Sequence, residues 1–261
     1  MAEPIFVSEN GAFRPTELSS GPWSADSQHG GAPGALLARE IEHTSPGDEL
    51  FVTRLTVEFL RPVPVAPLTV SAELARPGSR VQLVSASLLA GEVEVARATA
   101  LRIRRTDEPV SEGTPAEPPP SGPDTVSPLE PPERFARTFV GAMDQRFVSG
   151  GYGVGASVVW MRLRQPLVDD ERPSPLMRAV AAADFGNGVS ATLDWDVHVF
   201  VNPDLTVYLD RSPVGDWVCL DARTRIDPFG TGVAESVLYD EEGRVGRSLQ
   251  ALYVDRRPED G

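Results

Sequence analysis

The residues best placed to do chemistry lie in the stretch Ala181–Phe200. Asp184 stands in the last turn of a predicted helix, where the partial negative charge of the helix C-terminus disfavours a carboxylate. Thr192 follows after a turn rich in Gly and Asn. A carboxylate and a hydroxyl on rigid elements can together bind a water molecule or a carbonyl group. The structural alternative is that Asp184 bonds local backbone amides and that Thr192 is an ordinary strand residue.

A second group of interest precedes an earlier predicted helix. His29 is followed directly by Gly30 and Gly31. Glycines at a helix N-terminus let backbone amides approach a carbonyl or a phosphate. They can equally form a tight packing turn, and His29 can line a pocket or be a structural side chain. Both interpretations stay open for all three residues.

Composition and motifs exclude several function classes. The net charge of −14 disfavours a nucleic-acid partner, because an acidic surface repels phosphates. The one cysteine, Cys219, lies in an apolar run that predicts a small buried side chain, and with three histidines the chain shows no metal-cluster pattern. The glycines of 150–155 lack the Lys-Ser/Thr of a phosphate loop, and no serine nucleophile motif is present. We expect neither a metal nor a covalent acyl-enzyme.

Five arginines near strand ends are candidates for a local basic patch that would bind phosphates, or are simply solvated: Arg102, Arg104, Arg105, Arg256 and Arg257. No run approaches the roughly 20 apolar residues of a membrane-spanning helix. The N-terminus has no basic region followed by an apolar core. We therefore expect a cytoplasmic protein without a membrane partner.

A Pro-rich, acidic stretch divides the chain. Residues 106–133 predict a semi-extended linker between two portions of similar size, 1–105 and 134–257. Each portion predicts one helix, Pro33–His43 and Pro175–Asp184, followed by strands with alternating apolar residues. In the first portion the predicted strands begin at 51, 68, 80 and 93. In the second they are Ser157–Leu163 before the helix and then Ala191–Val201, Thr206–Arg211, Trp217–Ile226, Ala234–Tyr239 and Val245–Val254.

The two portions read as copies of one unit. The strand that carries Arg97 is the last of the first portion, and the strand that carries Arg247 is the last of the second. A strand, a central helix and an antiparallel meander in each half predict an α+β fold. We expect each helix to lie on the concave face of a curved sheet. Small residues on both helices would permit close approach: Gly34, Ala38, Ala179, Ala182 and Ala183.

Four segments carry a family resemblance: His29–Glu40 (HGGAPGALLARE), Ala183–Gly188 (ADFGNG), Ala191–Phe200 (ATLDWDVHVF) and Gly243–Arg256 (GRVGRSLQALYVDR). In this order the set resembles the acyl-CoA thioesterase II type, and more closely a group of actinobacterial thioesterase-superfamily proteins. The resemblance implies a double hot-dog fold, in which two helices are each wrapped by a curved antiparallel sheet. Residues 1–105 and 134–257 would be the two hot-dog units, the second carrying the catalytic residues.

The resemblance also implies site residues. In thioesterase II proteins an Asp, a Thr and a Gln jointly hold the hydrolytic water, and Asp184, Thr192 and Gln250 match those motif positions. The spacing around Gln250 is shifted by one residue. Asp184 would be the general base. His29, Gly30, Gly31 and Phe185 are the predicted substrate-binding residues, and Trp23 and Phe59 are further candidates to line the acyl chain.

The function that follows is hydrolysis of an acyl thioester in lipid metabolism, on coenzyme A or on a carrier protein. No cofactor is expected beyond the coenzyme A of the substrate. The alternative is a hot-dog protein that binds acyl thioesters without hydrolysing them. A hydratase is disfavoured, because the Asp-x-x-x-x-His pair that such enzymes use does not fit Asp26 and His29. Since hot-dog proteins commonly pair, we expect a homodimer.

Overall fold

The computed structural model describes residues 3–44, 50–169 and 171–257. Its first half holds one helix and six strands, whose bounds are β1 Phe6–Glu9, β2 Ala12–Pro15, α1 Gly31–His43, β3 Leu50–Phe59, β4 Leu68–Arg76, β5 Val81–Ala90 and β6 Val93–Arg104. The long strands alternate buried and exposed residues, as the sequence predicts, because successive side chains point to opposite faces.

The second half repeats this order with an interruption after its helix. Its elements are β7 Met143–Ser149, β8 Ser157–Leu163, α2 Pro175–Ala183, α3 Gly186–Val189, β9 His198–Val201, β10 Asp204–Leu209, β11 Val218–Asp227, β12 Thr231–Asp240 and β13 Gly243–Arg256. Ser174 begins α2 as an N-cap, with its Oγ 3.1 Å from the amide of Met177, and Pro175 follows at the first helical position. Both features were predicted from the sequence.

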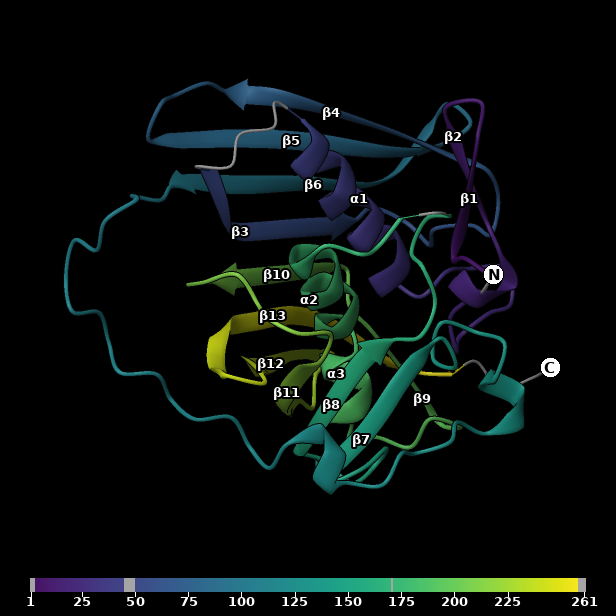
Figure 1. Ribbon diagram of the computed structural model, residues 1–261. Coiled ribbons are helices and arrows are strands. Elements are labelled where there is room, and N and C mark those ends of the chain that lie inside the picture. Colours follow the sequence, from purple (N-terminus) through teal and green to yellow (C-terminus); the bar gives the residue numbers. More distant parts are fainter. Residues whose placement is uncertain (1–2, 45–49, 170, 258–261) are drawn as a thin grey trace.

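The described strands form one continuous antiparallel sheet that wraps around the helices (Figure 1). Its order is β1-β2-β4-β5-β6-β3-β10-β13-β12-β11-β8-β7, with β9 beside β13. Each half therefore contributes the same arrangement in mirrored order, and β3 pairs with β10 at the seam. This order confirms the predicted duplication and the double hot-dog architecture.

A constant offset relates the two halves of the sheet. At the seam Thr56 pairs with Thr206, and their hydroxyls are 3.2 Å apart across 150 residues. Thr56 also pairs with Thr99, as Thr206 pairs with Leu249. One strand further out, Ala86 pairs with Ala98 as Ser236 pairs with Ser248. Each residue of the first meander thus has its counterpart 150 positions later.

The helices pack closely against each other inside the sheet. A Cβ atom built on Gly34 of α1 would stand 3.2 Å from Val180 Cγ1 of α2, and one on Gly31 would stand 2.8 Å from the carbonyl oxygen of Ala181. Ala179, Ala182 and the other small residues of α2 are buried. The small side chains therefore permit the close approach that the sequence predicts.

The predicted strand Ala191–Val201 is wrong over most of its length. Only His198–Val201 forms a strand, because α3 follows α2 and the chain then turns. The Asp194 carboxylate accepts from the amide of Asp196 at 2.9 Å, and the Asp194 carbonyl accepts from the amide of His198 at 2.9 Å. These local bonds satisfy backbone groups that a strand would pair with a neighbour.

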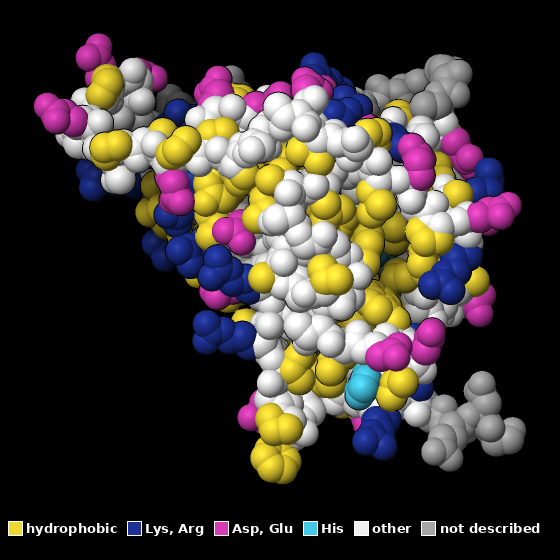
Figure 2. All heavy atoms as spheres, turned by 90° about the horizontal axis from the view of Figure 1, so that it is seen from below, with side chains coloured by type: hydrophobic (Ala, Val, Ile, Leu, Met, Phe, Trp, Pro, Cys, Tyr) yellow, Lys and Arg dark blue, Asp and Glu magenta, His cyan; other side chains and the backbone are white. Residues whose placement is uncertain are grey.

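The segment between the halves is irregular, as predicted, but it is tied to the second half. The indole of Trp160 donates to the carbonyl of Ser121 at 2.7 Å, and the hydroxyl of Tyr239 lies 3.0 Å from Glu117 Oε1. The amide of Arg244 donates to the Glu117 carbonyl at 2.9 Å. Figure 2 shows one face of the molecule, on which apolar side chains are interspersed with uncharged surface and most charged side chains lie toward the margin.

Gly246 offers a test of the seam between the halves. It lies on β13 opposite Leu209 of β10, and a Cβ atom there would overlap the carbonyl oxygen of Tyr208. We expect Gly246→Ala to lower the free energy of unfolding by about 1–3 kcal/mol, because the strand must shift to relieve the clash. Urea denaturation measures the change. Gly122→Ala is the control, since no atom lies within 4 Å of the added methyl group, and equal stability of the two variants would contradict the expectation.

Candidate active site

Asp184 lies where the ends of the two long helices meet. It is the C-cap residue of α2, and only 3 % of it is exposed. Its carboxylate packs against Gly30, the N-cap residue of α1, on which a Cβ atom would stand 2.8 Å from Oδ2 and 3.0 Å from Oδ1. The positive end of the α1 dipole therefore offsets the unfavourable C-terminal end of α2. The glycine is required because any side chain would displace the carboxylate.

Two side chains hold the carboxylate from opposite sides. His29 Nδ1 lies 3.0 Å from Asp184 Oδ2, and Asn202 Nδ2 donates to Asp184 Oδ1 at 2.8 Å. The same histidine nitrogen lies 3.1 Å from the amide of Gly31, which fixes the ring at the helix N-terminus. Sequence reasoning missed Asn202. The only signal was the Asn-Pro pair at 202–203, which marks a turn and not a site.

Gln250 reaches the same carboxylate from the inner face of β13. Its Nε2 donates to the backbone carbonyl of Asp184 at 3.1 Å and lies 3.3 Å from Oδ1. Its Oε1 accepts from the amide of Asn187 at 3.0 Å, so the amide group ties the end of α2 to the start of α3. Gly186 leaves room for it, because a Cβ atom there would stand 2.9 Å from that oxygen. The structure thus brings Asp184 and Gln250 together.

Thr192 is not part of this group in the structure. Its side chain is exposed in the loop between α3 and β9, 3.4 Å from the place a Cβ atom on Gly155 would take. The sequence placed Thr192 at the start of a strand, on one face with Asp194 and His198. That strand begins only at His198, so the loop carries Thr192 outward.

Aromatic rings surround the histidine. His29 stacks on Phe185 with ring centroids 4.3 Å apart, and Phe139 lies 5.2 Å from it. Phe59 also reaches the site, since a Cβ atom on Gly30 would stand 2.8 Å from its Cζ. The side chain of His29 is 12 % exposed and that of Asp184 is 3 % exposed, so the imidazole is more accessible than the carboxylate.

Trp23 belongs to a neighbouring aromatic cluster. It stacks on Trp195 at 4.5 Å, and Phe200 packs edge-on against both rings. Arg257 covers the cluster: its guanidinium lies 5.4 Å from the Trp23 ring and its Nε donates to the Trp195 carbonyl at 2.8 Å. Beside this cluster is an open hollow of ≈ 520 Å³ whose lining includes Leu193, His198, Tyr253 and Arg256.

The five arginines of the predicted basic patch do not act as one group. Arg102 is buried and donates to the carbonyls of Ile41 and Thr44, so it closes the C-terminal end of α1. Arg104 and Arg105 are exposed at the end of β6, whereas Arg256 and Arg257 lie beside the tryptophan cluster. Arg256 is six residues beyond Gln250 on β13, roughly 20 Å along the strand at about 3.3 Å per residue.

Cys219 is the small buried side chain that the sequence predicts. Burial raises the pKa of its thiol far above the ordinary value, which keeps it protonated and unreactive. Within residues 3–44, 50–169 and 171–257 no three His, Cys, Asp or Glu side chains are grouped to hold a metal ion. None of the described helices is both long and apolar enough to cross a membrane.

Comparison with protein families covers most of the chain. Residues 19–103 match the family model described as the acyl-CoA thioesterase N-terminal domain. Residues 113–254 match the one described as the acyl-CoA thioesterase C-terminal domain. No curated protein sequence matches the chain.

Solved structures share the fold at low sequence identity. A proposed thioesterase II from Thermobifida fusca has 16 % identity and a TM-score of 0.73, over 96 % of this chain and 95 % of that one. A hot-dog protein of unknown function from Alicyclobacillus acidocaldarius has 18 % identity and a TM-score of 0.73, over 97 % and 96 %. An acyl-CoA thioesterase II from Mycobacterium marinum has 18 % identity and a TM-score of 0.62, over 100 % and 96 %. These likenesses show the fold.

The bridging role of Gln250 predicts a stability effect. We expect Gln250→Ala to lower the free energy of unfolding by about 1–3 kcal/mol, because the Asp184 carbonyl and the Asn187 amide lose a buried partner. Urea denaturation is the measurement. Leu249→Ala is the matched control on the opposite face of β13, where Leu249 is 41 % exposed. A Gln250→Ala variant as stable as the control would show that the bridge is dispensable.

Proposed function

The chain belongs to the acyl-CoA thioesterase family and is an acyl-CoA thioester hydrolase, and we propose that it works by general-base activation of water at Asp184. The observation that carries this proposal is the buried carboxylate held between His29, Asn202 and Gln250. A carboxylate offers about four lone-pair sites. Asn202 and Gln250 use two of them at Oδ1, and Oδ2 is left for His29 and a water molecule.

The proposed reaction has two steps. Asp184 takes a proton from the water, whose oxygen attacks the thioester carbonyl to form a tetrahedral intermediate. The carbon–sulfur bond then breaks, and the proton passes from Asp184 to the departing thiolate. The products are a carboxylic acid and a free thiol. The N-terminus of α1 at Gly30 and Gly31 lies against the same carboxylate, so its positive end also stabilises the negative charge that develops on the carbonyl oxygen.

In this proposal Gln250 is a positioning residue. Both ends of its amide are bonded to the protein, the oxygen to Asn187 and the nitrogen to Asp184. It therefore acts through Asp184, rather than on the water as the family resemblance implies. His29 is the side chain past which the thioester reaches the carboxylate, because it is more exposed than Asp184.

The substrate would follow the aromatic side chains. We propose that the acyl chain packs near Phe59 and Phe185, and that the phosphates of coenzyme A lie toward the hollow that contains Arg256. Arginine suits phosphate contact because its donors match the oxygens in pairs. A carrier-protein thioester as substrate, a homodimer and a cytoplasmic location stay predictions from the sequence.

Replacement of the base tests the proposal directly. We expect Asp184→Asn to lower kcat for acyl-CoA hydrolysis by about 10²–10⁴-fold, because the amide cannot accept the proton. Release of free thiol from a series of acyl-CoAs is the measurement. Asp194→Asn is the control, since Asp194 is exposed in the neighbouring loop. Undiminished turnover by Asp184→Asn removes the proposed base, and tight acyl-CoA binding without turnover by the wild type favours the non-catalytic alternative.

Thr192 provides a second test. We expect Thr192→Val to lower kcat by about 10-fold at most, because an exposed hydroxyl contributes only about 0.5–1.5 kcal/mol through one hydrogen bond. The same thiol-release assay measures it, with Thr192→Ser as the control that keeps the hydroxyl. A loss as large as that of Asp184→Asn would return Thr192 to the water-binding role that the sequence predicts.

A further inference from the structure

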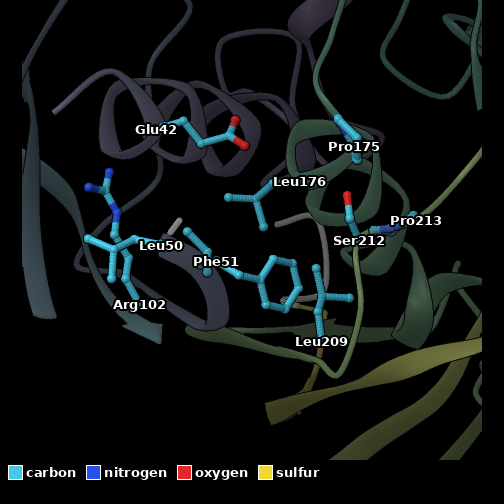
Figure 3. A pocket seen from close by; sticks show the side chains of 10 residues that line it. Glu42, Leu50, Phe51, Arg102, Pro175, Leu176, Leu209, Ser212 and Pro213 are labelled. Atoms are coloured by element: carbon cyan, nitrogen blue, oxygen red, sulfur yellow. The ribbon is translucent and has the colours of Figure 1, made fainter. Parts of the chain in front are cut away.

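A second cavity lies at the opposite end of the two helices from Asp184 (Figure 3). Its volume is ≈ 230 Å³, and it is enclosed by the end of α1, the start of α2, the first residues of β3 and the last of β10. The lining residues are Glu42, Leu50, Phe51, Val52, Arg102, Pro175, Leu176, Leu209, Ser212 and Pro213.

The internal repeat makes this cavity the counterpart of the candidate active site. With the offset of 150 residues that relates the sheets, Val52 corresponds to Asn202 and Leu209 to Phe59. Both counterparts contact the Asp184 group. The bulges agree as well: the β3–β6 pairing shifts by one residue between Val52 and Arg54, and the break between β9 and β10 falls 150 positions later.

The two places also differ in which helix ends there and which begins. At the candidate active site the end of α2 meets the start of α1, and at the cavity the end of α1 meets the start of α2. Glu42 takes the place of the acid, and the Ser174 hydroxyl, which precedes α2, lies 2.5 Å from its Oε2. His29, which precedes α1, holds Asp184 in the corresponding way.

The polar groups that would support hydrolysis are missing from the cavity. Ala100 stands where the repeat places the counterpart of Gln250, and Val52 stands in place of Asn202. Burial raises the pKa of Glu42, and its carboxyl accepts from the Ser174 hydroxyl. Arg102 and Ser212 are further polar residues of the lining, while the ring of Phe51 and the side chains of Leu176 and Leu209 face the space below Glu42 (Figure 3).

We propose that this cavity is a second, non-hydrolytic acyl site, which binds an acyl chain with its carbonyl group toward Glu42 and Ser212. The inference rests on the proposed active site, because the repeat carries the ligand class over from it. The hydrocarbon tail of an acyl chain of up to eight carbons fits beyond the carboxyl group, since ≈ 230 Å³ holds roughly seven groups at ~30 Å³ each. The occupant is the free acid product or a second acyl thioester, and both contain an acyl chain that ends in a carbonyl group.

Binding stoichiometry tests the proposal. Isothermal titration calorimetry with octanoate should give two equivalents per wild-type chain and one per chain of Ser212→Trp, whose indole fills the cavity from a loop. Ser212→Thr is the matched control and should keep two. Leu176→Trp is a second filling variant, with Leu176→Ile as its control. Titration of Asp184→Asn with octanoyl-CoA distinguishes the sources, because two equivalents there identify the thioester as an occupant and one identifies the free acid.

The proposal is overturned if both filling variants bind as many equivalents of octanoate as their controls. Failure of the proposed function is a different result: it appears as full turnover by Asp184→Asn and leaves the octanoate stoichiometry untouched. Thermal unfolding of each variant identifies a misfolded one, and the other filling variant then decides.

Discussion

The contact between one helix's C-terminal carboxylate and the other helix's first glycine constrains the rest of the structure. Asp184 lies at the C-terminus of α2, where the helix dipole disfavours a carboxylate. The positive end of the α1 dipole offsets this effect only if the backbone of α1 comes within van der Waals contact of the carboxylate. Gly30 permits that contact, and Gly31 lets the carbonyl of Ala181 approach as well. The sheet must then hold both helices at this separation, which its continuous seam between β3 and β10 does.

The duplication produces two helix junctions, which are the places where the end of one long helix meets the start of the other. Different residues at the two junctions give them different chemistry. At one junction Gln250 and Asn202 hold a buried carboxylate, and at the other the equivalent positions are Ala100 and Val52. A buried carboxylate needs such partners, because an uncompensated charge in an apolar interior is costly. At the other junction the acid, Glu42, accepts from the Ser174 hydroxyl, and burial raises its pKa. One duplicated unit thus yields the candidate active site and a cavity with different polar groups.

The segment after α2 breaks the symmetry most visibly. In the first half a short connection leads from α1 into β3, whereas α3 and a loop intervene between α2 and β9. The insertion brings Asn187 to Gln250 and places Trp195 against Trp23. It therefore builds one side of the candidate site, and it is also what moves Thr192 out to the solvent.

The sequence by itself determined the two long helices, most of the long strands and their duplication, but not β1, β2 or β7. Alternation in β13 and the Ser174-Pro175 start of α2 are local signals, and each acts through neighbours in the chain. The motif resemblance also selected Asp184 and Gln250, which the structure brings together. Local signals failed for Ala191–Val197, where Asp194 forms turn bonds that compete with strand pairing.

Only the tertiary structure decided which groups surround the carboxylate. Asn202 carries no sequence signal beyond a turn, and the role of His29 depends on a contact between two different halves of the molecule. Such contacts follow from helix packing and from the register of β3 against β10. Both depend on the fit of side chains far apart in the chain, and no local pattern encodes that fit.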